Sequence, residues 1–367
     1  MLAMVVMGSF FVSGAKSETF YICHDDSDTL SFTNIPGKDC EVLSNGKDGD
    51  SRYPGKGVSN KSEANTVTSE LISGHGIQNN ELNSIQNNAG LSHFLGQLSA
   101  PGRVAMNHVT VYHFGDSHVN SGVFPKSIAR VLQQRFGDGG GSFCRLNKFD
   151  GNRSLKNVPS DSGDDANAGD LPQETCVPIG GDTESLLSVF TQGQGPQNIG
   201  LSYYAFGISG KTIDYFSRSR SMLYHLRKYR PDLVIITLGT NDAFARLDYE
   251  DILIHLDRLF SSIRSVSPTA SILFTVPPDT FFRSGVNNNY TPIVRRAMID
   301  FCRQNGCAWW DLYEIMGGAG SMNGFRERGL GSRDRIHFTS NGYRSTGESI
   351  AKAIIETFNR ATVSGKR

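Results

Sequence analysis

The chain has 367 residues, enough for one large globular domain with additional segments. Its 36 Lys and Arg residues balance 36 Asp and Glu residues, so the formal net charge is zero. Proteins that bind nucleic acid through its phosphates usually carry a basic excess, so we expect no nucleic-acid partner. Apolar residues make up 38% of the chain, as in globular proteins, and the 40 glycines have no regular period, which excludes a collagen-like repeat.

The N-terminus begins with an apolar run, residues 2–15, that is too short to span a bilayer. It ends in the small residues Ser13, Gly14 and Ala15, which are typical of a signal-peptidase site, although no positive residue precedes the run. We therefore expect residues 1–15 to be a signal peptide, with no transmembrane segment left after its cleavage. The alternative is a buried N-terminal strand.

Two short segments follow. In residues 16–42, two β-rich runs (19–23 and 30–35) flank a polar turn, which predicts a small β-hairpin module. This segment resembles the short N-terminal module found ahead of many envelope proteins. Residues 43–90 are rich in Asn, Ser, Gly and Lys, and their few apolar residues predict a flexible linker.

The chain has 6 cysteines, and none of them form Cys-x-x-Cys pairs. Export would place them in an oxidising compartment, where we expect three local disulfides. The expected pairs are Cys23–Cys40, Cys144–Cys176 and Cys302–Cys307. Six buried free thiols are the alternative.

Residues 91–367 alternate between strand and helix patterns. Strands are predicted at 109–114, 201–206, 233–238, 271–276 and 308–312, and helices at 91–98, 126–135, 213–229, 252–266, 292–304 and 342–358. This alternation predicts an α/β three-layer sandwich, in which helices cover both faces of a central five-stranded parallel sheet. Residues 137–198 are polar and are predicted to be an inserted loop region.

Four short motifs follow predicted strands, which is where ligands bind in parallel α/β sheets. They are GDSH at 115–118, GISGKT at 207–212, GTND at 239–242 and, after the last strand, DRIH at 334–337. Each motif alone is common. Their joint occurrence in this order, at these places, is specific.

Together the four motifs resemble the blocks of the SGNH (GDSL-type) hydrolase family, over residues 91–358. The resemblance implies a flavodoxin-like α/β fold and ester hydrolysis by a serine nucleophile. By motif, Ser117 is the nucleophile, His337 the base and Asp334 its partner. The backbone N–H groups of Ser117 and Gly210 and the side-chain amide of Asn241 would form the oxyanion hole.

These residue types suit that chemistry. A serine hydroxyl is a weak nucleophile until a base removes its proton, and a histidine can do so if a carboxylate fixes its tautomer. The oxyanion formed by attack on an ester needs hydrogen-bond donors placed in advance. The structural alternatives are helix capping for Ser117 and Asp334, a turn role for Asn241 and a core position for His337.

The motif neighbours Asp116, His118, Thr240 and Asp242 are candidate pocket residues. Many members of the family have Leu where this chain has His118, which either lines the pocket or packs. The other histidines have no metal-ligand spacing, and there is no dinucleotide or phosphate-loop pattern, so we expect no metal and no cofactor.

Residues 309–322 (WWDLYEIMGGAGSM) resemble a segment of envelope proteins similar to peptidoglycan O-acetylesterases. This resemblance implies an exported enzyme of the bacterial periplasm or envelope that removes O-acetyl groups from a cell-wall or other surface glycan. Alternatively, Trp309 and Trp310 belong to the core. The other functions considered are an O-acyltransferase with the same residues, a lipase or arylesterase acting on small esters, and a non-enzymatic glycan-binding protein. The sequence does not predict the oligomeric state.

Overall fold

The computed structural model describes residues 21–24, 30–33, 40–42, 82–99, 109–146, 174–178 and 200–364. The chain divides into two units, residues 1–55 and 56–367. In the first unit, β1 (Tyr21–His24) pairs antiparallel with β2 (Leu30–Thr33) and with β3 (Cys40–Val42). The expected hairpin is thus extended by a third strand. The expected signal peptide lies outside the described residues.

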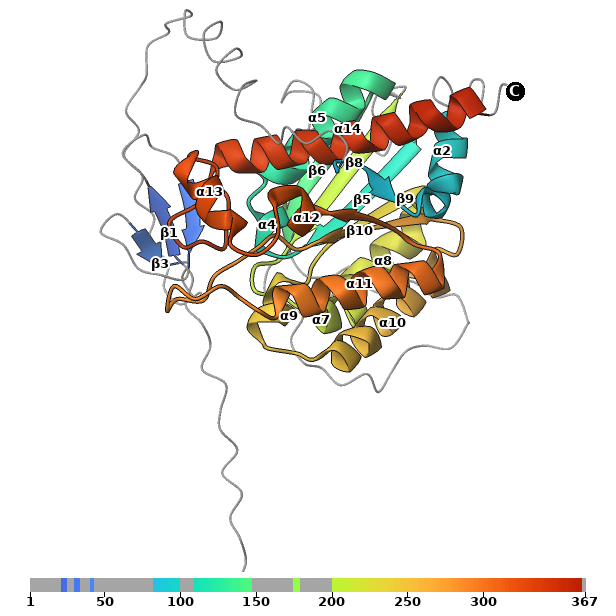
Figure 1. Cartoon of the computed structure of the whole chain (residues 1–367). Coiled ribbons are helices and arrows are strands. Elements are labelled where there is room, and N and C mark those ends of the chain that lie inside the picture. The colour runs from blue at the N-terminus through green and yellow to red at the C-terminus, as the bar shows by residue number, and fades with distance from the viewer. Residues whose placement is uncertain are drawn as a thin grey trace, which may run out of the picture. The chain divides into compact units, whose positions relative to one another are not determined.

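In the second unit, the described residues form an eight-stranded sheet (Figure 1). Six strands run parallel, in the spatial order β6 (Asp138–Leu146), β8 (Leu201–Gly207), β5 (Val109–Gly115), β9 (Leu233–Thr237), β10 (Ser271–Val276) and β11 (Ala308–Asp311). The edge strands β4 (Ile85–Gln86) and β7 (Glu174–Pro178) are antiparallel to their neighbours. The predicted α/β fold is confirmed, with all five predicted strands present and β6 as a sixth parallel strand.

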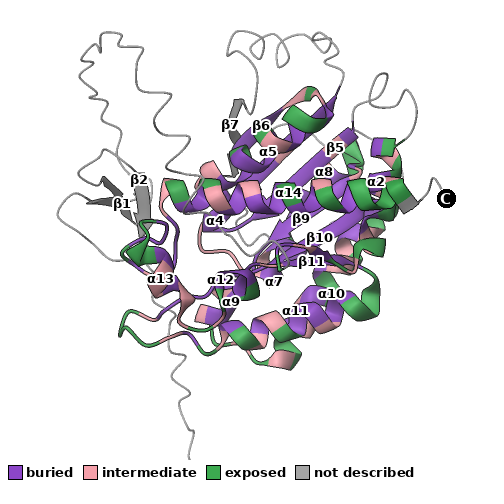
Figure 2. Cartoon of the chain, turned by 45° about the horizontal axis from the view of Figure 1, so that its top comes forward, coloured by how far each residue is buried: buried purple, intermediate pink, exposed green. Residues whose placement is uncertain are grey.

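Helices cover both faces of the sheet (Figure 1). One layer holds α2 (Ser92–Ser99), α5 (Val123–Phe136) and α14 (Ser340–Ser364), and the other holds α7 (Ile213–Ser217), α8 (Arg220–Tyr229), α10 (Tyr249–Val266) and α11 (Thr291–Asn305). Within β5, Val111 packs with the first layer and Phe114 with the second. The sheet is therefore buried on both faces (Figure 2).

Two regions that are predicted to lack regular structure contain strands. β4 and most of the 3-10 helix η1 (Asn88–Leu91) lie inside the predicted linker 43–90, where Ile85 is buried against the core. β6 and β7 both lie inside residues 137–198, whose polar composition predicts an inserted loop region. Gly141 has φ +147°, and a Cβ there would lie 1.9 Å from the carbonyl oxygen of Tyr203. Only glycine fits this position in the sheet.

The disulfide Cys302–Cys307 is present and links the end of α11 to the start of β11. Cys144 is also disulfide-bonded and lies opposite Cys176 in the register of β6 and β7. Cys23 lies opposite Cys40 in the register of β1 and β3. In the part of the chain that the structure describes, no helix is long and apolar enough to cross a membrane.

The order of the strands fixes where a ligand can bind. From β5 the chain moves to β6 and returns to β8 on one side, and from β9 it adds β10 and β11 on the other side. The direction of winding therefore reverses between the neighbours β5 and β9. Open α/β sheets bind ligands at the carboxyl ends of the strands at such a switch point.

Candidate active site

Ser117 lies directly after β5, at the switch point. It is the first residue of α4 (Ser117–Asn120), and Asp116 caps that helix by accepting the backbone N–H of His118 at 3.0 Å. A Cβ at Gly115 would lie 2.5 Å from the carbonyl oxygen of Thr237. The end of β5 thus packs closely against β9 at Gly115, and α4 starts two residues later, so Ser117 lies at the carboxyl edge of the sheet.

The structure brings Ser117, His337 and Asp334 together. The Ser117 Oγ lies 2.8 Å from Nε2 of His337, and Nδ1 of His337 lies 2.6 Å from Oδ2 of Asp334. The other carboxylate oxygen accepts the backbone N–H groups of Ile336 and His337 at 2.9 and 3.0 Å. Arg335 adopts a left-handed conformation (φ +57°) between Asp334 and His337. The arrangement can pass the serine proton to the imidazole while the carboxylate stabilises the imidazolium.

Electrostatics favour a charged imidazole at this place. Burial disfavours the imidazolium of His337, but the charge and hydrogen bond of Asp334, with a smaller contribution from Asp116, raise the pKa of His337 above 6.5. Burial likewise opposes the Asp334 carboxylate, yet the charge of His337 and the hydrogen bonds lower the pKa of Asp334. The pair is therefore suited to hold a transferred proton.

The predicted oxyanion residues follow three neighbouring strands. Ser117 follows β5, Gly210 follows β8, and Asn241 lies in α9 (Thr240–Phe244) after β9. Gly210 has φ +76°, a conformation that favours glycine. The side chain of Asn120 donates to the hydroxyl of Ser209 at 2.8 Å and ties α4 to the Gly210 turn. Sequence reasoning missed Asn120 and Ser209, whose only signal is their closeness to Ser117 and Gly210.

The amide of Asn241 already has two acceptors. Its Nδ2 donates to the carbonyl oxygen of Lys211 at 3.0 Å and to Oδ2 of Asp116 at 3.1 Å. An oxyanion would have to share or displace one of them, and a full negative charge is a stronger acceptor than a peptide carbonyl. In this structure Asn241 joins the turn that carries Gly210 to the segment that carries Ser117.

The four candidate pocket residues divide into two pairs. His118 and Thr240 line a small pocket together with Thr237, Phe338 and Tyr343, and none of the predicted catalytic or oxyanion residues is part of its lining. The Nδ1 of His118 lies 3.1 Å from the Tyr343 hydroxyl, and burial lowers the pKa of His118 to about 3, so the ring is neutral.

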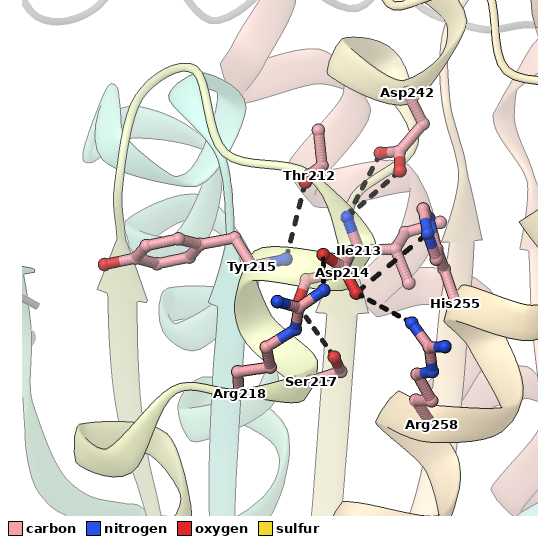
Figure 3. Close-up of polar contacts among 9 residues, drawn as sticks. All are labelled: Thr212, Ile213, Asp214, Tyr215, Ser217, Arg218, Asp242, His255 and Arg258. Atoms are coloured by element: carbon pink, nitrogen blue, oxygen red, sulfur yellow. Dashed lines mark hydrogen bonds and ion pairs between the residues drawn. The ribbon is translucent and has the colours of Figure 1, made fainter. Parts of the chain in front are cut away.

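Asp116 and Asp242 do not line this pocket and instead bind backbone groups. Burial raises the pKa of each carboxyl group to about 7. Both oxygens of Asp242 accept the backbone N–H of Ile213 at 3.2 Å (Figure 3). Among the described residues, no group of His, Cys, Asp and Glu side chains could hold a metal ion.

Comparisons with known proteins point to one family. Residues 183–345 match the model of the GDSL-like lipase/acylhydrolase family, a range that includes Gly210, Asn241, Asp334 and His337 but not Ser117. A solved structure described as a peptidoglycan O-acetylesterase in action is 18% identical, with a TM-score of 0.56, and the match covers 74% of this chain and 98% of that chain.

Two further solved structures are similar. An acetyl xylan esterase is 14% identical (TM-score 0.40; 67% of this chain and 100% of that chain). A lipase/acylhydrolase from Enterococcus faecalis is 16% identical (TM-score 0.40; 68% and 96%). No curated protein sequence matches the chain.

The fold, the site and the family model define a hydrolase that acts on carboxylic esters. The match places residues 183–345, with three of the four motifs, in the GDSL-like lipase/acylhydrolase family.

Proposed function

We propose that this enzyme is an exported serine esterase that removes O-acetyl groups from a cell-wall, peptidoglycan-like or other surface glycan. The observation that carries the proposal is the hydrogen-bonded chain from Ser117 through His337 to Asp334, with distances of 2.8 and 2.6 Å. All three residues are buried, which strengthens the interactions between them.

In the proposed reaction, the Ser117 oxygen attacks the acetyl carbonyl carbon while His337 Nε2 takes the hydroxyl proton. The N–H groups of Ser117, Gly210 and Asn241 bind the resulting oxyanion. When the tetrahedral intermediate collapses, the bond to the glycan oxygen breaks, and His337 returns the proton to that oxygen. A water molecule then hydrolyses acetyl-Ser117 by the same steps, releasing acetate and the free serine.

The choice of substrate is supported by the fold of the peptidoglycan O-acetylesterase and by residues 309–322. Trp309 and Trp310 are core residues, since Trp310 is fully buried and donates to the side chain of Asn83 at 2.9 Å. The later part of the segment is anchored by Asp279, whose carboxylate accepts the backbone N–H of Met322 at 3.1 Å. Export is supported by the disulfide-bonded Cys144, Cys302 and Cys307.

The test is acetate release from O-acetylated peptidoglycan, with p-nitrophenyl acetate as a small-ester control. The wild-type enzyme should release acetate from both. Ser117→Ala should release none while keeping the wild-type circular dichroism and melting temperature, since it loses only one oxygen. Full activity of Ser117→Ala would overturn the assignment of the nucleophile. Turnover of the small ester alone would reject the peptidoglycan substrate and move the search to other acylated glycans or an acceptor sugar.

A further inference from the structure

The two oxyanion residues Gly210 and Asn241 lie on different segments, yet an oxyanion needs both donors at once. Gly210 lies in an irregular turn between β8 and α7, whereas Asn241 is fixed in α9. A misplacement of about 1 Å can reduce the rate of an enzyme a hundredfold. The contacts that hold the Gly210 turn against α9 therefore matter for the reaction.

Consecutive residues of α9 make these contacts. The amide of Asn241 donates to the carbonyl oxygen of Lys211 at 3.0 Å, and both carboxylate oxygens of Asp242 accept the backbone N–H of Ile213 at 3.2 Å. Figure 3 shows the Asp242 carboxylate facing this N–H group. The backbone is thus held one residue and three residues after Gly210.

Helix capping alone accounts poorly for a carboxylate at this place. The side chain of Thr212 already caps α7 by accepting the N–H of Tyr215, and Asp242 lies outside that helix. Asp242 is fully buried, and none of the described Lys, Arg or His side chains forms an ion pair with it. A buried carboxyl group without a cation costs stability, so a contribution to the fold alone does not account for it.

We propose that Asp242 is a positioning residue for ester hydrolysis. By binding Ile213 N–H, its carboxyl group holds the Gly210 turn against α9, so that the Gly210 N–H and the Asn241 amide keep the spacing that an oxyanion requires. The proposal rests on the serine mechanism proposed above but not on the identity of the glycan.

The chain offers a matched control in Asp214. This residue is the second residue of α7, next to Ile213, and its carboxylate pairs with Arg218 and with Arg258 on α10 (Figure 3). Asp214→Asn removes a carboxylate from the same helix but leaves the contact between Asp242 and Ile213 in place.

The experiment compares Asp242→Ala, Asp242→Asn and Asp214→Asn with the wild-type enzyme. Hydrolysis of p-nitrophenyl acetate gives kcat and KM, and inhibition by a boronic acid, which forms a tetrahedral adduct on a serine, reports the oxyanion hole directly. For Asp242→Ala we expect kcat to fall about 10- to 100-fold, less than the loss of a whole donor, with KM changed less than about twofold. Boronate inhibition should weaken by the same factor as kcat.

The control variants distinguish the loss of the Asp242–Ile213 hydrogen bond from the loss of a negative charge and from a loss of stability. Asp242→Asn keeps an oxygen that can accept the Ile213 N–H and should stay within about fivefold of the wild-type kcat. Asp214→Asn should leave kcat and boronate inhibition unchanged. If Asp242→Ala does not fold, Asp242→Ser, which keeps a small polar side chain, takes its place.

Three results would overturn this inference but leave the proposed function intact. They are a wild-type kcat in Asp242→Ala, a loss of kcat in Asp242→Ala with unchanged boronate inhibition, and a loss of kcat in Asp214→Asn as large as that in Asp242→Ala. A wild-type enzyme that hydrolyses no ester would overturn the proposed function, and this inference with it.

Discussion

Two carboxyl groups influence His337 in different ways. Asp334 binds its Nδ1 at 2.6 Å, whereas Asp116 acts on it only through its charge. Both favour the imidazolium, and burial opposes it. The outcome is a raised pKa, which makes His337 a better proton acceptor and sets the pH below which the enzyme loses activity.

The sign of the pH effect follows from this. The protonated ring cannot act as a base, so activity is present above the pKa of His337 and is lost as the pH falls through it, at a value above 6.5. Asp334→Asn removes the carboxylate charge that raises the pKa of His337, while burial still lowers this pKa. The acid limb of the pH–rate profile should therefore move to lower pH. The maximal rate should also fall, by about 10⁴-fold, because an amide no longer holds His337 in the tautomer whose Nε2 can accept the serine proton.

The measurement is kcat/KM for p-nitrophenyl acetate between pH 4 and pH 9 in both proteins. A wild-type rate that stays flat down to pH 4, or an acid limb that does not move in Asp334→Asn, would contradict this role of the pair.

The sequence places the reactive side chains but not the contacts that hold them. Ser117, Asp334 and His337 come together because each motif follows a strand or loop at one edge of the sheet. The bond between Asp242 and Ile213 joins two turns whose relative position depends on packing between elements. No spacing rule within one motif contains that information, so sequence reasoning treated Asp242 as a pocket residue.

Among the elements, buried parallel strands were the easiest to predict. Residues 233–237 (LVIIT) are a continuous apolar run because both faces of β9 are covered by helices. The predicted helix 213–229 is instead two helices, because Ser219 caps a new helix by accepting the N–H of Met222 at 3.2 Å. β6 escaped prediction because its glycines are required by close backbone contact, which only the folded sheet reveals.

The close backbone contact in β6 predicts that Gly141→Ala and Gly96→Ala change the free energy of unfolding in opposite directions. Gly141→Ala would force a Cβ into the backbone of Tyr203 at φ +147°, and we expect it to lower the free energy of unfolding by about 2 kcal/mol or more. Gly96→Ala lies on the exposed side of α2 with no atom nearby, so it should raise that free energy by about 0.5–1 kcal/mol.

Urea unfolding of both variants measures the difference. Equal stability of Gly141→Ala and the wild-type protein would mean that β6 does not require glycine at this position.

The whole molecule has no formal net charge, yet it buries carboxyl groups that favour the neutral form. Burial raises the pKa of Asp242 to about 7, whereas in the unfolded chain it stays near 3.8. Between these values the folded protein binds more protons than the unfolded chain, so this group makes the free energy of unfolding fall as the pH rises.

Replacing Asp242 with Asn removes this contribution. The difference in free energy of unfolding, Asp242→Asn minus wild type, should therefore become more positive as the pH rises from about 4 to about 7. The increase is up to about 1.4 kcal/mol per pH unit. Denaturant unfolding at several pH values in this window measures it. Parallel curves for the two proteins would show that Asp242 does not titrate on unfolding.

The nucleophile and its base are 220 residues apart along the chain. Ser117 is made before His337 and before the α14 helix, which packs against α5. During synthesis, the emerging chain therefore carries a serine without a base. Esterase activity begins only when the segment that carries His337 has folded onto the segment that carries Ser117, so the order of synthesis itself keeps the unfinished enzyme inactive.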